Sequence, residues 1–514
     1  MSAVLTPTAK PTNPPPRLMS EQAFVRTIGT PLVEGNTVRI LRDSRENYPA
    51  WMEAIASARH KIYFENYIIS NDETGRRFVQ ALAERAGAGV RVRVIYDWLG
   101  TRRGGHLLAP IVAAGGEVRC FNPPHLDSPF GWVTRDHRKS ISVDGRIAFV
   151  TGLCVSRRWE GDPKRGIEPW RDTGVQLQGP AVADVERAFA QVWRETGAPV
   201  PDDELTDPQS IAPAGEVKLA VVASAPADAG VYRLDQIIAT AAKRTLWLTD
   251  AYFVGLAPYV QALRGAALDD VDVRLLVPGT SDLQLLSPVT RAGYRALLEA
   301  GVRIFEWNGP MLHAKTAVAD CRWARVGSSN LNIASWLGNY ELDVTADEVS
   351  FAAEMEEMYQ EDLTNATEIV LRGRNRIAPT VRLPRATPKI RGGAGSASRA
   401  AAGALRISNT VGAAIAKRRV LGPAEAGVML PVGLLLVLLA VVCMKWPELV
   451  AIPVGVLAGW VGLALLMQAW RLRRAPVPSD DRDDPSVAEE ELGEPPSSSA
   501  SAERSAAPAK EERS

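Results

Sequence analysis

The feature that most constrains this chain is a short pattern that occurs twice. The two copies are His137-x-Lys139-xxxx-Asp144 and His313-x-Lys315-xxxx-Asp320. The chain has only five histidines, so two of them in matched settings indicate a duplicated unit. Residues two apart on an extended segment point to the same face. Each histidine is therefore predicted to share a face with its lysine.

Two such faces brought together would surround one anion with two imidazoles and two ammonium groups. One imidazole can attack phosphorus, the other can protonate a leaving alkoxide, and the lysines can hold the non-bridging oxygens. This phosphodiester chemistry requires no metal. The four cysteines show no CxxC spacing, so neither a zinc site nor a disulfide framework is predicted.

The duplicated pattern resembles the signature of the phospholipase D superfamily, and the resemblance extends from about Ile62 to about Asn365. The second copy fits fully, because the family's Gly-Ser-x-Asn turn follows it. The first copy departs from that turn. The residues of the second turn are Gly327, Ser328 and Asn330, and those at the corresponding places after the first copy are Thr151, Gly152 and Cys154.

The resemblance implies a set of site residues. The catalytic set is His137, Lys139, Asp144, His313, Lys315 and Asp320, and the substrate-binding set is Ser328, Asn330, Asp172 and Glu341. Within the catalytic set, the two aspartates are expected to position the motif and not to touch substrate. Asp172 and Glu341 suit a supporting role, because a carboxylate that accepts a hydrogen bond from one ring nitrogen fixes the histidine tautomer.

The flanks of the two copies predict an α/β fold with two pseudo-symmetric halves and a mixed sheet in each. A strand, a helix, a second strand and, after a further helix, a short strand precede each histidine motif. In the first half these are residues 61–69, 75–86, 90–96 and 117–121, and in the second 244–254, 257–267, 271–277 and 302–307. Each half brings one histidine, so the site is expected at their interface.

The predicted organisation also includes segments outside these halves. The divisions are a disordered lead (1–20), a first half (21–210), a second half (211–371), a basic juxtamembrane linker (372–425), a transmembrane hairpin (426–474) and a disordered acidic tail (475–514). The apolar runs of the hairpin are Gly427 to Val442 and Leu449 to Trp470. The second run would be about 33 Å long as a helix, enough to cross a bilayer. Two buried core helices or one re-entrant segment are the alternatives.

Flanking charge predicts the orientation of the hairpin. Lys417, Arg418 and Arg419 precede it, and Arg471, Arg473 and Arg474 follow it. The positive-inside bias places both ends, and the catalytic halves, in the cytoplasm of a multi-pass inner-membrane protein. The linker from Arg372 to Arg419 has no acidic residue. It is expected to bind an anionic membrane surface, at about 1 kcal/mol per basic side chain, although a solvated linker would tolerate the same charge.

Within the superfamily the chain is most similar to the bacterial cardiolipin synthases, through runs such as TrpArgAspThr (170–173) and AsnTyrGluLeu (339–342). That resemblance implies phosphatidyl transfer from one phosphatidylglycerol to another through a phosphohistidine, without a cofactor. The same residues would serve a phospholipase D that hydrolyses phospholipids. A nuclease of the superfamily would need a basic groove, and zero net charge with two apolar runs argues against a nucleic-acid partner. A membrane scaffold without activity is the remaining alternative.

Overall fold

The computed structural model describes residues 17–102, 104–124, 133–279, 293–372, 376–379 and 423–474. Most of the expected lead, nearly all of the basic linker, and the acidic tail lie outside the described residues.

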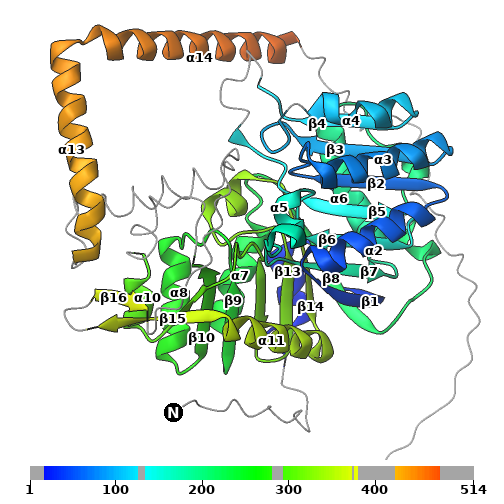
Figure 1. The fold of residues 1–514 in the computed structure, drawn as a ribbon, viewed down its shortest axis with the longest axis horizontal. Helices are drawn as coiled ribbons and strands as arrows, with labels where there is room; N and C mark the ends of the chain where they lie inside the picture. Colours follow the sequence, from blue (N-terminus) through cyan, green and yellow to red (C-terminus); the bar gives the residue numbers. More distant parts are fainter. Residues whose placement is uncertain are drawn as a thin grey trace, which may run out of the picture.

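The strands of the described residues form one mixed sheet that runs through both halves of the chain (Figure 1). Its order is β16-β15-β11-β10-β9-β12-β13-β14-β8-β1-β7-β6-β5-β2-β3-β4. The strands of the first half are β1 (Val33–Arg42), β2 (Lys61–Asn66), β3 (Arg91–Asp97), β4 (Glu117–Phe121), β5 (Lys139–Val143), β6 (Ile147–Thr151) and β7 (Thr173–Gln178). Those of the second are β8 (Val217–Ser224), β9 (Thr245–Thr249), β10 (Asp272–Pro278), β11 (Arg303–Trp307), β12 (Thr316–Ala319), β13 (Trp323–Gly327), β14 (Glu341–Asp347), β15 (Ala366–Arg372) and β16 (Arg376–Pro379).

Strand order and direction repeat outward from the centre of the sheet. One arm reads β1-β7-β6-β5-β2-β3-β4 and the other β8-β14-β13-β12-β9-β10-β11. In both arms the last three strands are parallel to one another and the remaining pairs are antiparallel. The arms join through an antiparallel pairing of β1 with β8, at Val33 and Leu219. The prediction of an α/β fold with a mixed sheet is confirmed.

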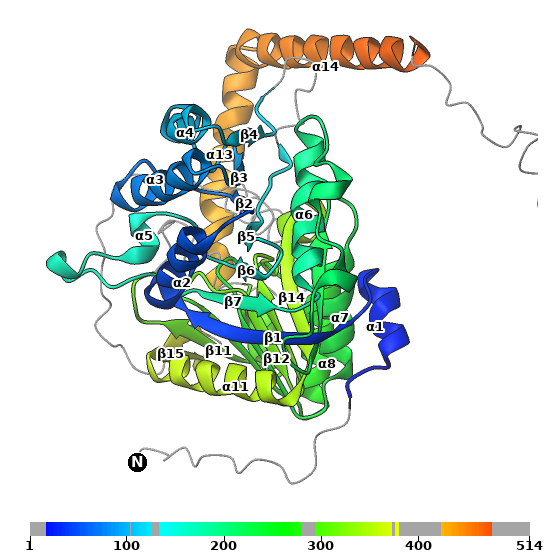
Figure 2. The same cartoon turned by 90° about the vertical axis from the view of Figure 1, so that its right-hand side faces the viewer.

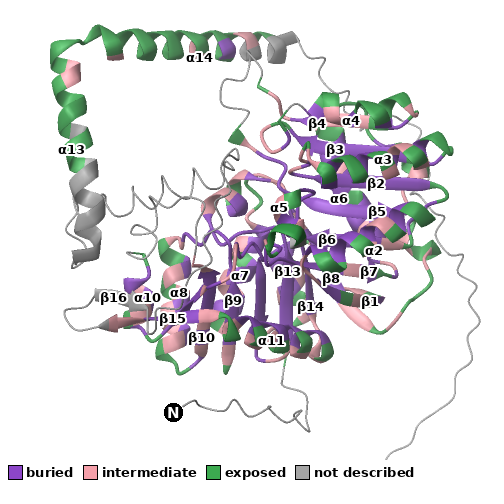
Figure 3. Ribbon diagram, in the orientation of Figure 1, coloured by how far each residue is buried: buried purple, intermediate pink, exposed green. Residues whose placement is uncertain are grey.

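Helices cover both faces of the sheet (Figure 2). They are α1 (Glu21–Ile28), α2 (Asp43–Ser57), α3 (Glu73–Gly87), α4 (Gly104–Ala113), α5 (Arg157–Glu160), α6 (Val182–Glu195), α7 (Gly230–Ala241), α8 (Ala257–Leu268), α10 (Arg295–Glu299) and α11 (Val349–Thr364). Short turns are η2 (Pro163–Arg165), η3 (Asp202–Glu204), η4 (Pro208–Ser210) and η6 (Ala334–Gly338). Figure 3 shows buried strands between helices whose outer faces are exposed.

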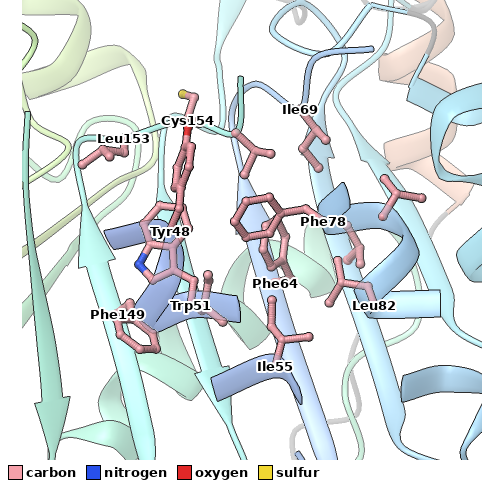
Figure 4. Close-up of a cluster of buried hydrophobic side chains, with 14 of the residues drawn as sticks. Tyr48, Trp51, Ile55, Phe64, Ile69, Phe78, Leu82, Phe149, Leu153 and Cys154 are labelled. Atoms are coloured by element: carbon pink, nitrogen blue, oxygen red, sulfur yellow. Dashed lines mark hydrogen bonds between the residues drawn. The ribbon is translucent and has the colours of Figure 1, made fainter. Parts of the chain in front are cut away.

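The alternation of side chains along β2 explains how one strand serves two layers. Phe64 packs with Phe78 of α3 in the aromatic cluster of Figure 4, whereas the neighbouring Tyr63 stacks on Phe189 of α6 at 4.8 Å on the opposite face. At the end of that cluster nearest the site, the hydroxyl of Tyr48 donates to the carbonyl of Cys154 at 2.6 Å. The turn that follows the first histidine motif is therefore anchored to this apolar cluster.

Two helices follow the sheet, α13 (Pro423–Lys445) and α14 (Glu448–Arg474). Among the described residues, one segment is long and apolar enough to cross a membrane, Glu448–Met467 of α14, and that judgement rests on length and composition alone. Gly433–Lys445 of α13 is a shorter apolar stretch. Figures 1 and 2 draw the two helices diverging from their junction and not packed side by side. A hairpin with two crossings therefore stays a prediction.

The aspartate that closes each motif holds the strand beside it. Both Asp144 and Asp320 have positive φ, 54° and 55°. The carboxylate of Asp144 accepts hydrogen bonds of 2.8–2.9 Å from the backbone N–H groups of residues 59, 60 and 61, and that of Asp320 does the same for residues 243, 244 and 245. Each carboxylate thereby fixes the start of the neighbouring strand in the sheet, which is β2 for Asp144 and β9 for Asp320.

We expect Asp144→Asn to lower the free energy of unfolding by roughly 1–2 kcal/mol at pH 7, because three charge-assisted hydrogen bonds weaken at a half-exposed site. Burial raises the pKa of Asp144, but the three N–H donors outweigh it and leave the pKa below 3.8. A lowered pKa adds stability that is present above the unfolded pKa and is lost as the pH falls through the folded one. Thermal melts at pH 7 and pH 3.5 should therefore show that the melting temperatures of variant and wild type differ less at pH 3.5 than at pH 7. An unchanged difference would contradict this role.

Candidate active site

Backbone hydrogen bonds between the halves bring the two motifs together. Two isolated parallel bridges join them, Asp136 with Tyr340 and Arg171 with Leu312. In the first bridge, the N–H of His137 donates to the carbonyl of Tyr340 at 2.9 Å. In the second, the N–H of His313 donates to the carbonyl of Arg171 at 2.7 Å. Each histidine is thus tied by its own backbone to the opposite half.

Each histidine also contacts a carboxylate that belongs to the opposite half of the chain, so the two halves exchange their carboxylates. Nδ1 of His137, in the first half, lies 2.9 Å from Oε2 of Glu341 in the second. Nδ1 of His313, in the second half, lies 2.7 Å from Oδ2 of Asp172 in the first. A carboxylate accepts from an N–H, so Nδ1 carries the proton and Nε2 keeps its lone pair. The expected supporting role of the two carboxylates fits this geometry, but the sequence did not reveal that they are exchanged.

The two carboxylates are held by different groups. Glu341 accepts a 2.6 Å hydrogen bond from the hydroxyl of Ser328, whereas Asp172 accepts a 2.8 Å hydrogen bond from the indole Nε1 of Trp159. The residue that corresponds to Ser328 is Gly152, and a Cβ there would lie 2.2 Å from Oδ1 of Asp172. The close approach of Asp172 therefore accounts for the glycine at this one position of the turn.

Five residues of the expected set have protein partners in this structure. Ser328, Asp172 and Glu341, grouped with the substrate-binding residues, lie against the histidines or against each other, and for Asp172 and Glu341 this fits the supporting role expected from the sequence. Asp144 and Asp320, grouped with the catalytic residues but expected only to position the motif, each lie beyond the far end of a strand from their histidine and bind backbone N–H groups. Their role is to position strands, because the alternation and length of β5 and β12 keep them from the site.

Both motif lysines are buried beside the imidazoles. Lys139 and Lys315 are 0% and 1% exposed, and each donates to the carbonyl of its own histidine. Nζ of Lys315 also lies 2.9 Å from Nδ1 and 3.2 Å from Nε2 of His313. Among the described residues, no hydrogen bond to Nε2 of His137 is found. The two histidines therefore differ in whether Nε2 is engaged.

Burial sets the protonation states of this site. It lowers the pKa of His137 to about 4 and that of His313 to about 3, against the opposing effect of the carboxylates. Burial also lowers the pKa of Lys315 to about 8. The pKa values of Asp172 and Glu341 are lowered, because their histidine partners and the lysines outweigh burial. At neutral pH the site holds neutral imidazoles, ionised carboxylates and charged lysine.

Aromatic rings enclose the histidines. Tyr67 meets His137 edge-on with centroids 5.0 Å apart, and Trp159 meets His313 in the same way at 5.0 Å. Tyr252 and Trp170 also contact His313, with centroids 5.9 and 6.0 Å away. Trp323 and Trp336, which follow the second motif in the sequence, do not join this group and pack in the core of the second half.

Asn330 offers the one pair of polar side-chain atoms in the second motif turn that has no partner within the described part of the chain. Its Nδ2 and Oδ1 are both buried without a hydrogen bond, and the residue is 0% exposed. A buried amide in this state is a candidate to bind a ligand oxygen. Cys154 stands at the matching place in the first half and brings only a thiol, whose pKa burial raises.

Comparisons with known proteins agree with this site. Residues 51–193 and 235–363 match a family model described as "Cardiolipin synthase, PLD-like domain". Cardiolipin synthase A of Pseudomonas aeruginosa is 34% identical over 353 residues, which are 68% of this chain and 71% of that protein. The cardiolipin synthase of Alkalihalophilus pseudofirmus is 30% identical over 66% of this chain and 68% of its own.

A solved structure, phosphatidylserine synthase of Haemophilus influenzae, resembles the fold with a TM-score of 0.53 at 12% identity, over 68% of this chain and 91% of that one. Its likeness concerns the fold alone. Together, the duplicated motif and these matches define a phospholipase D-type phosphatidyltransferase. The chain belongs to the family of cardiolipin synthases with a phospholipase D-like domain.

We expect a bell-shaped dependence of kcat/KM on pH. Activity should fall as the pH drops through about 4, because His137 must be neutral to attack. It should also fall as the pH rises through about 8, because Lys315 must be charged to attract the anion. Initial rates on phospholipid vesicles from pH 3.5 to pH 10 measure both limbs. A plateau that continues to pH 10 would contradict the role of Lys315.

Proposed function

We propose that the protein is a membrane-anchored enzyme that makes cardiolipin from two molecules of phosphatidylglycerol and releases glycerol. The observation that carries the proposal is the exchanged pair of histidine–carboxylate contacts, 2.9 Å for His137 with Glu341 and 2.7 Å for His313 with Asp172. Two imidazoles oriented in this way, with two buried lysines, suit a double displacement at phosphorus. The relatives named above support the lipid substrate.

In the first step, Nε2 of His137 attacks phosphorus and the bond from phosphorus to the glycerol oxygen breaks. The proton for that oxygen comes from the ammonium of Lys315, whose Nζ lies 3.2 Å from Nε2 of His313, and Nε2 of His313 delivers it. Glycerol leaves, and the phosphatidyl group remains on His137. Glu341 stabilises the charge that the His137 ring gains.

In the second step, the terminal hydroxyl of another phosphatidylglycerol attacks the phosphatidyl-histidine. Nε2 of His313 takes the hydroxyl proton, which restores the proton of the Lys315–His313 pair. The bond from phosphorus to His137 breaks and cardiolipin is released. Water in place of the lipid hydroxyl would give phosphatidic acid, so the outcome depends on how well the bound lipid excludes water.

The assignment of His137 as nucleophile is supported by the unequal state of the two Nε2 atoms. Nε2 of His313 lies 3.2 Å from the ammonium of Lys315, which suits proton transfer. No such contact is found for Nε2 of His137 in the part of the chain that is described. We propose that the reaction is independent of metal, because Lys139, Lys315 and the amide of Asn330 supply the groups that would hold the non-bridging oxygens.

We propose that the catalytic unit consists of two pseudo-symmetric halves, residues 21–210 and 211–371. The repeated strand order of the two arms and the matched positions of Asp144 and Asp320 support this division. Residues 426–474 would form a hairpin, whereas most of residues 1–20 and of the basic linker, and all of residues 475–514, lie outside the described residues. No nucleic acid is expected as a partner.

The membrane anchor is proposed from the apolar surface of α14. Its side chains stay open to the surroundings, as with Leu465 at 62% and Leu466 at 70% exposure (Figure 3). A soluble protein rarely exposes an apolar surface of this extent. A hydrocarbon core would cover it, with α13 as the second crossing and the basic linker against anionic headgroups.

We expect Trp446→Cys, in a Cys443→Ser background, to react with a membrane-impermeant maleimide added to intact cells, because the turn between the helices would face outward. Ser479→Cys in the same background should react only after permeabilisation, because the flanking arginines keep that end inside. Labelling is read by gel shift. Equal labelling of both positions in intact cells would contradict two crossings.

We expect full-length protein to convert phosphatidylglycerol vesicles into cardiolipin and glycerol in the presence of a metal chelator. His137→Ala and His313→Ala should each lower the rate by at least roughly 10²-fold, because each removes the nucleophile or the acid–base group. Products are resolved by mass spectrometry, with Arg303→Met as a control outside the site. Phosphatidic acid as the sole product would indicate a hydrolase. No lipid turnover together with cleavage of DNA would indicate a nuclease.

A further inference from the structure

One arginine beside the site links three parts of the molecule. The guanidinium of Arg171 makes a bidentate pair with Asp362 of α11, Nε to Oδ1 at 2.7 Å and Nη2 to Oδ2 at 2.9 Å. Its Nη1 lies 3.2 Å from Oδ1 of Asp43 in α2. Arg171 belongs to the first half and α11 to the second, so the side chain joins the halves. It is 6% exposed.

The backbone of Arg171 is tied to the motif of the other half. Its N–H donates to the carbonyl of Met311 at 2.8 Å, and its carbonyl accepts from the N–H of His313 at 2.7 Å. The next residue, Asp172, carries the carboxylate that holds Nδ1 of His313. One dipeptide thus fixes both the backbone and the ring of a single histidine.

Asp43, which contacts Arg171, also holds the backbone of Asp172. The N–H of Asp172 donates to Oδ1 of Asp43 at 2.8 Å, and its carbonyl accepts from the N–H of Asp43 at 2.9 Å. Arg171 also donates through Nη1 to that carbonyl. A shift of α11 relative to α2 would therefore move the carboxylate on which the orientation of His313 depends.

The arrangement at the other histidine is different. There Arg138 donates through Nε to the carbonyl of Glu341 at 3.0 Å, but among the described residues its guanidinium hydrogen-bonds carbonyl and amide oxygens and no carboxylate. The residue before Glu341 is Tyr340, whose side chain carries no positive charge and packs against Phe121 and Arg138. The effect of Arg171 is thus directed at His313, and a defect there should differ from a defect at His137. An experiment can therefore separate a defect at His313 from a defect at His137.

We propose that Arg171 is a positioning residue that holds His313 in its acid–base orientation across the interface between the two halves. The inference rests on the proposed function, in which His313 protonates the leaving glycerol. If Arg171 acts through His313, its loss matters when the leaving group needs a proton. It does not matter when the leaving group departs as a stable anion. A general loss of structure would slow both reactions alike.

The test compares two donors in vesicles under single-turnover conditions, phosphatidylglycerol and the p-nitrophenyl ester of phosphatidic acid. Glycerol requires a proton to leave, whereas nitrophenolate does not. Arg171→Met is expected to slow glycerol release by at least about tenfold, part of the 10²–10⁴-fold that a general acid contributes. Nitrophenolate release should stay within about threefold of wild type, because the attack by His137 is intact. Asp362→Asn, which keeps the arginine and the side-chain shape, should show the same preference, and it serves if Arg171→Met does not fold.

The matched control is Arg303→Met, which breaks a bidentate pair with Glu368 at 2.8 and 3.2 Å between two strands of the second half. It should leave both rates unchanged. Equal slowing of both donors by Arg171→Met and Asp362→Asn, or no slowing of either, would overturn the proposal.

His313→Ala and His137→Ala report separately on the proposed function. His313→Ala should spare the nitrophenyl donor, and His137→Ala should abolish both reactions. If His313→Ala slows both donors alike, the acid–base role of His313 is wrong and the role of Arg171 fails with it. If only the proposal for Arg171 is wrong, His313→Ala should still spare the nitrophenyl donor.

Discussion

The structure depends on a single interaction made twice, a buried histidine whose Nδ1 contacts a carboxylate from the other half of the chain. Burial alone would leave each carboxylate and each lysine costly to ionise. The exchange offsets that cost by placing opposite charges and hydrogen-bond partners in one dry interface. It also means that the catalytic geometry and the docking of the halves have the same physical origin.

The two arms of the sheet have the same topology, but they support the site with different chemistry. Beneath the second motif, the buried guanidinium of Arg325 lies between Asp235 and Asp343, at 3.2 and 2.8 Å. At the place of Arg325 in the first arm stands Phe149, which packs with Trp51 in the aromatic cluster. An ionic core demands fixed directions, whereas an apolar core demands only volume. The turn of the second motif, which carries the buried and unpaired side-chain amide of Asn330, is the one supported by these ion pairs.

Much of the fold was readable from the sequence, because alternating apolar runs such as residues 90–96 have a strong local period. They correspond to β3, and residues 257–267 correspond to α8. The central pairing of β1 with β8 was not predicted, because it joins residues far apart in the chain and depends on tertiary packing. The second of the two apolar runs that follow the sheet forms a helix of crossing length, residues Glu448–Met467, whereas the first contributes only the shorter apolar stretch Gly433–Lys445.

The candidate site was predictable in its members but not in its connections. The two His-x-Lys pairs stood out by residue type and spacing, and the resemblance to the phospholipase D superfamily pointed to the carboxylates Asp172 and Glu341. Which carboxylate serves which histidine could not be deduced, since sequence spacing carries no information about the exchange between halves. Arg171 was visible only as part of a short run, TrpArgAspThr, and its partner Asp362 lies 191 residues away. Spatial neighbours at such separation leave no local pattern.

The exchange also imposes an order in time. His137 and the Glu341 that orients it are 204 residues apart, and the ribosome adds residues at about 5–20 per second, so roughly 10–40 s separate their appearance. During that interval the nascent first half carries an imidazole without its carboxylate, and until His313 is added it also lacks the second imidazole. A growing chain therefore holds no complete site before Glu341 has been added. Competence arises in one event, when the finished second half docks.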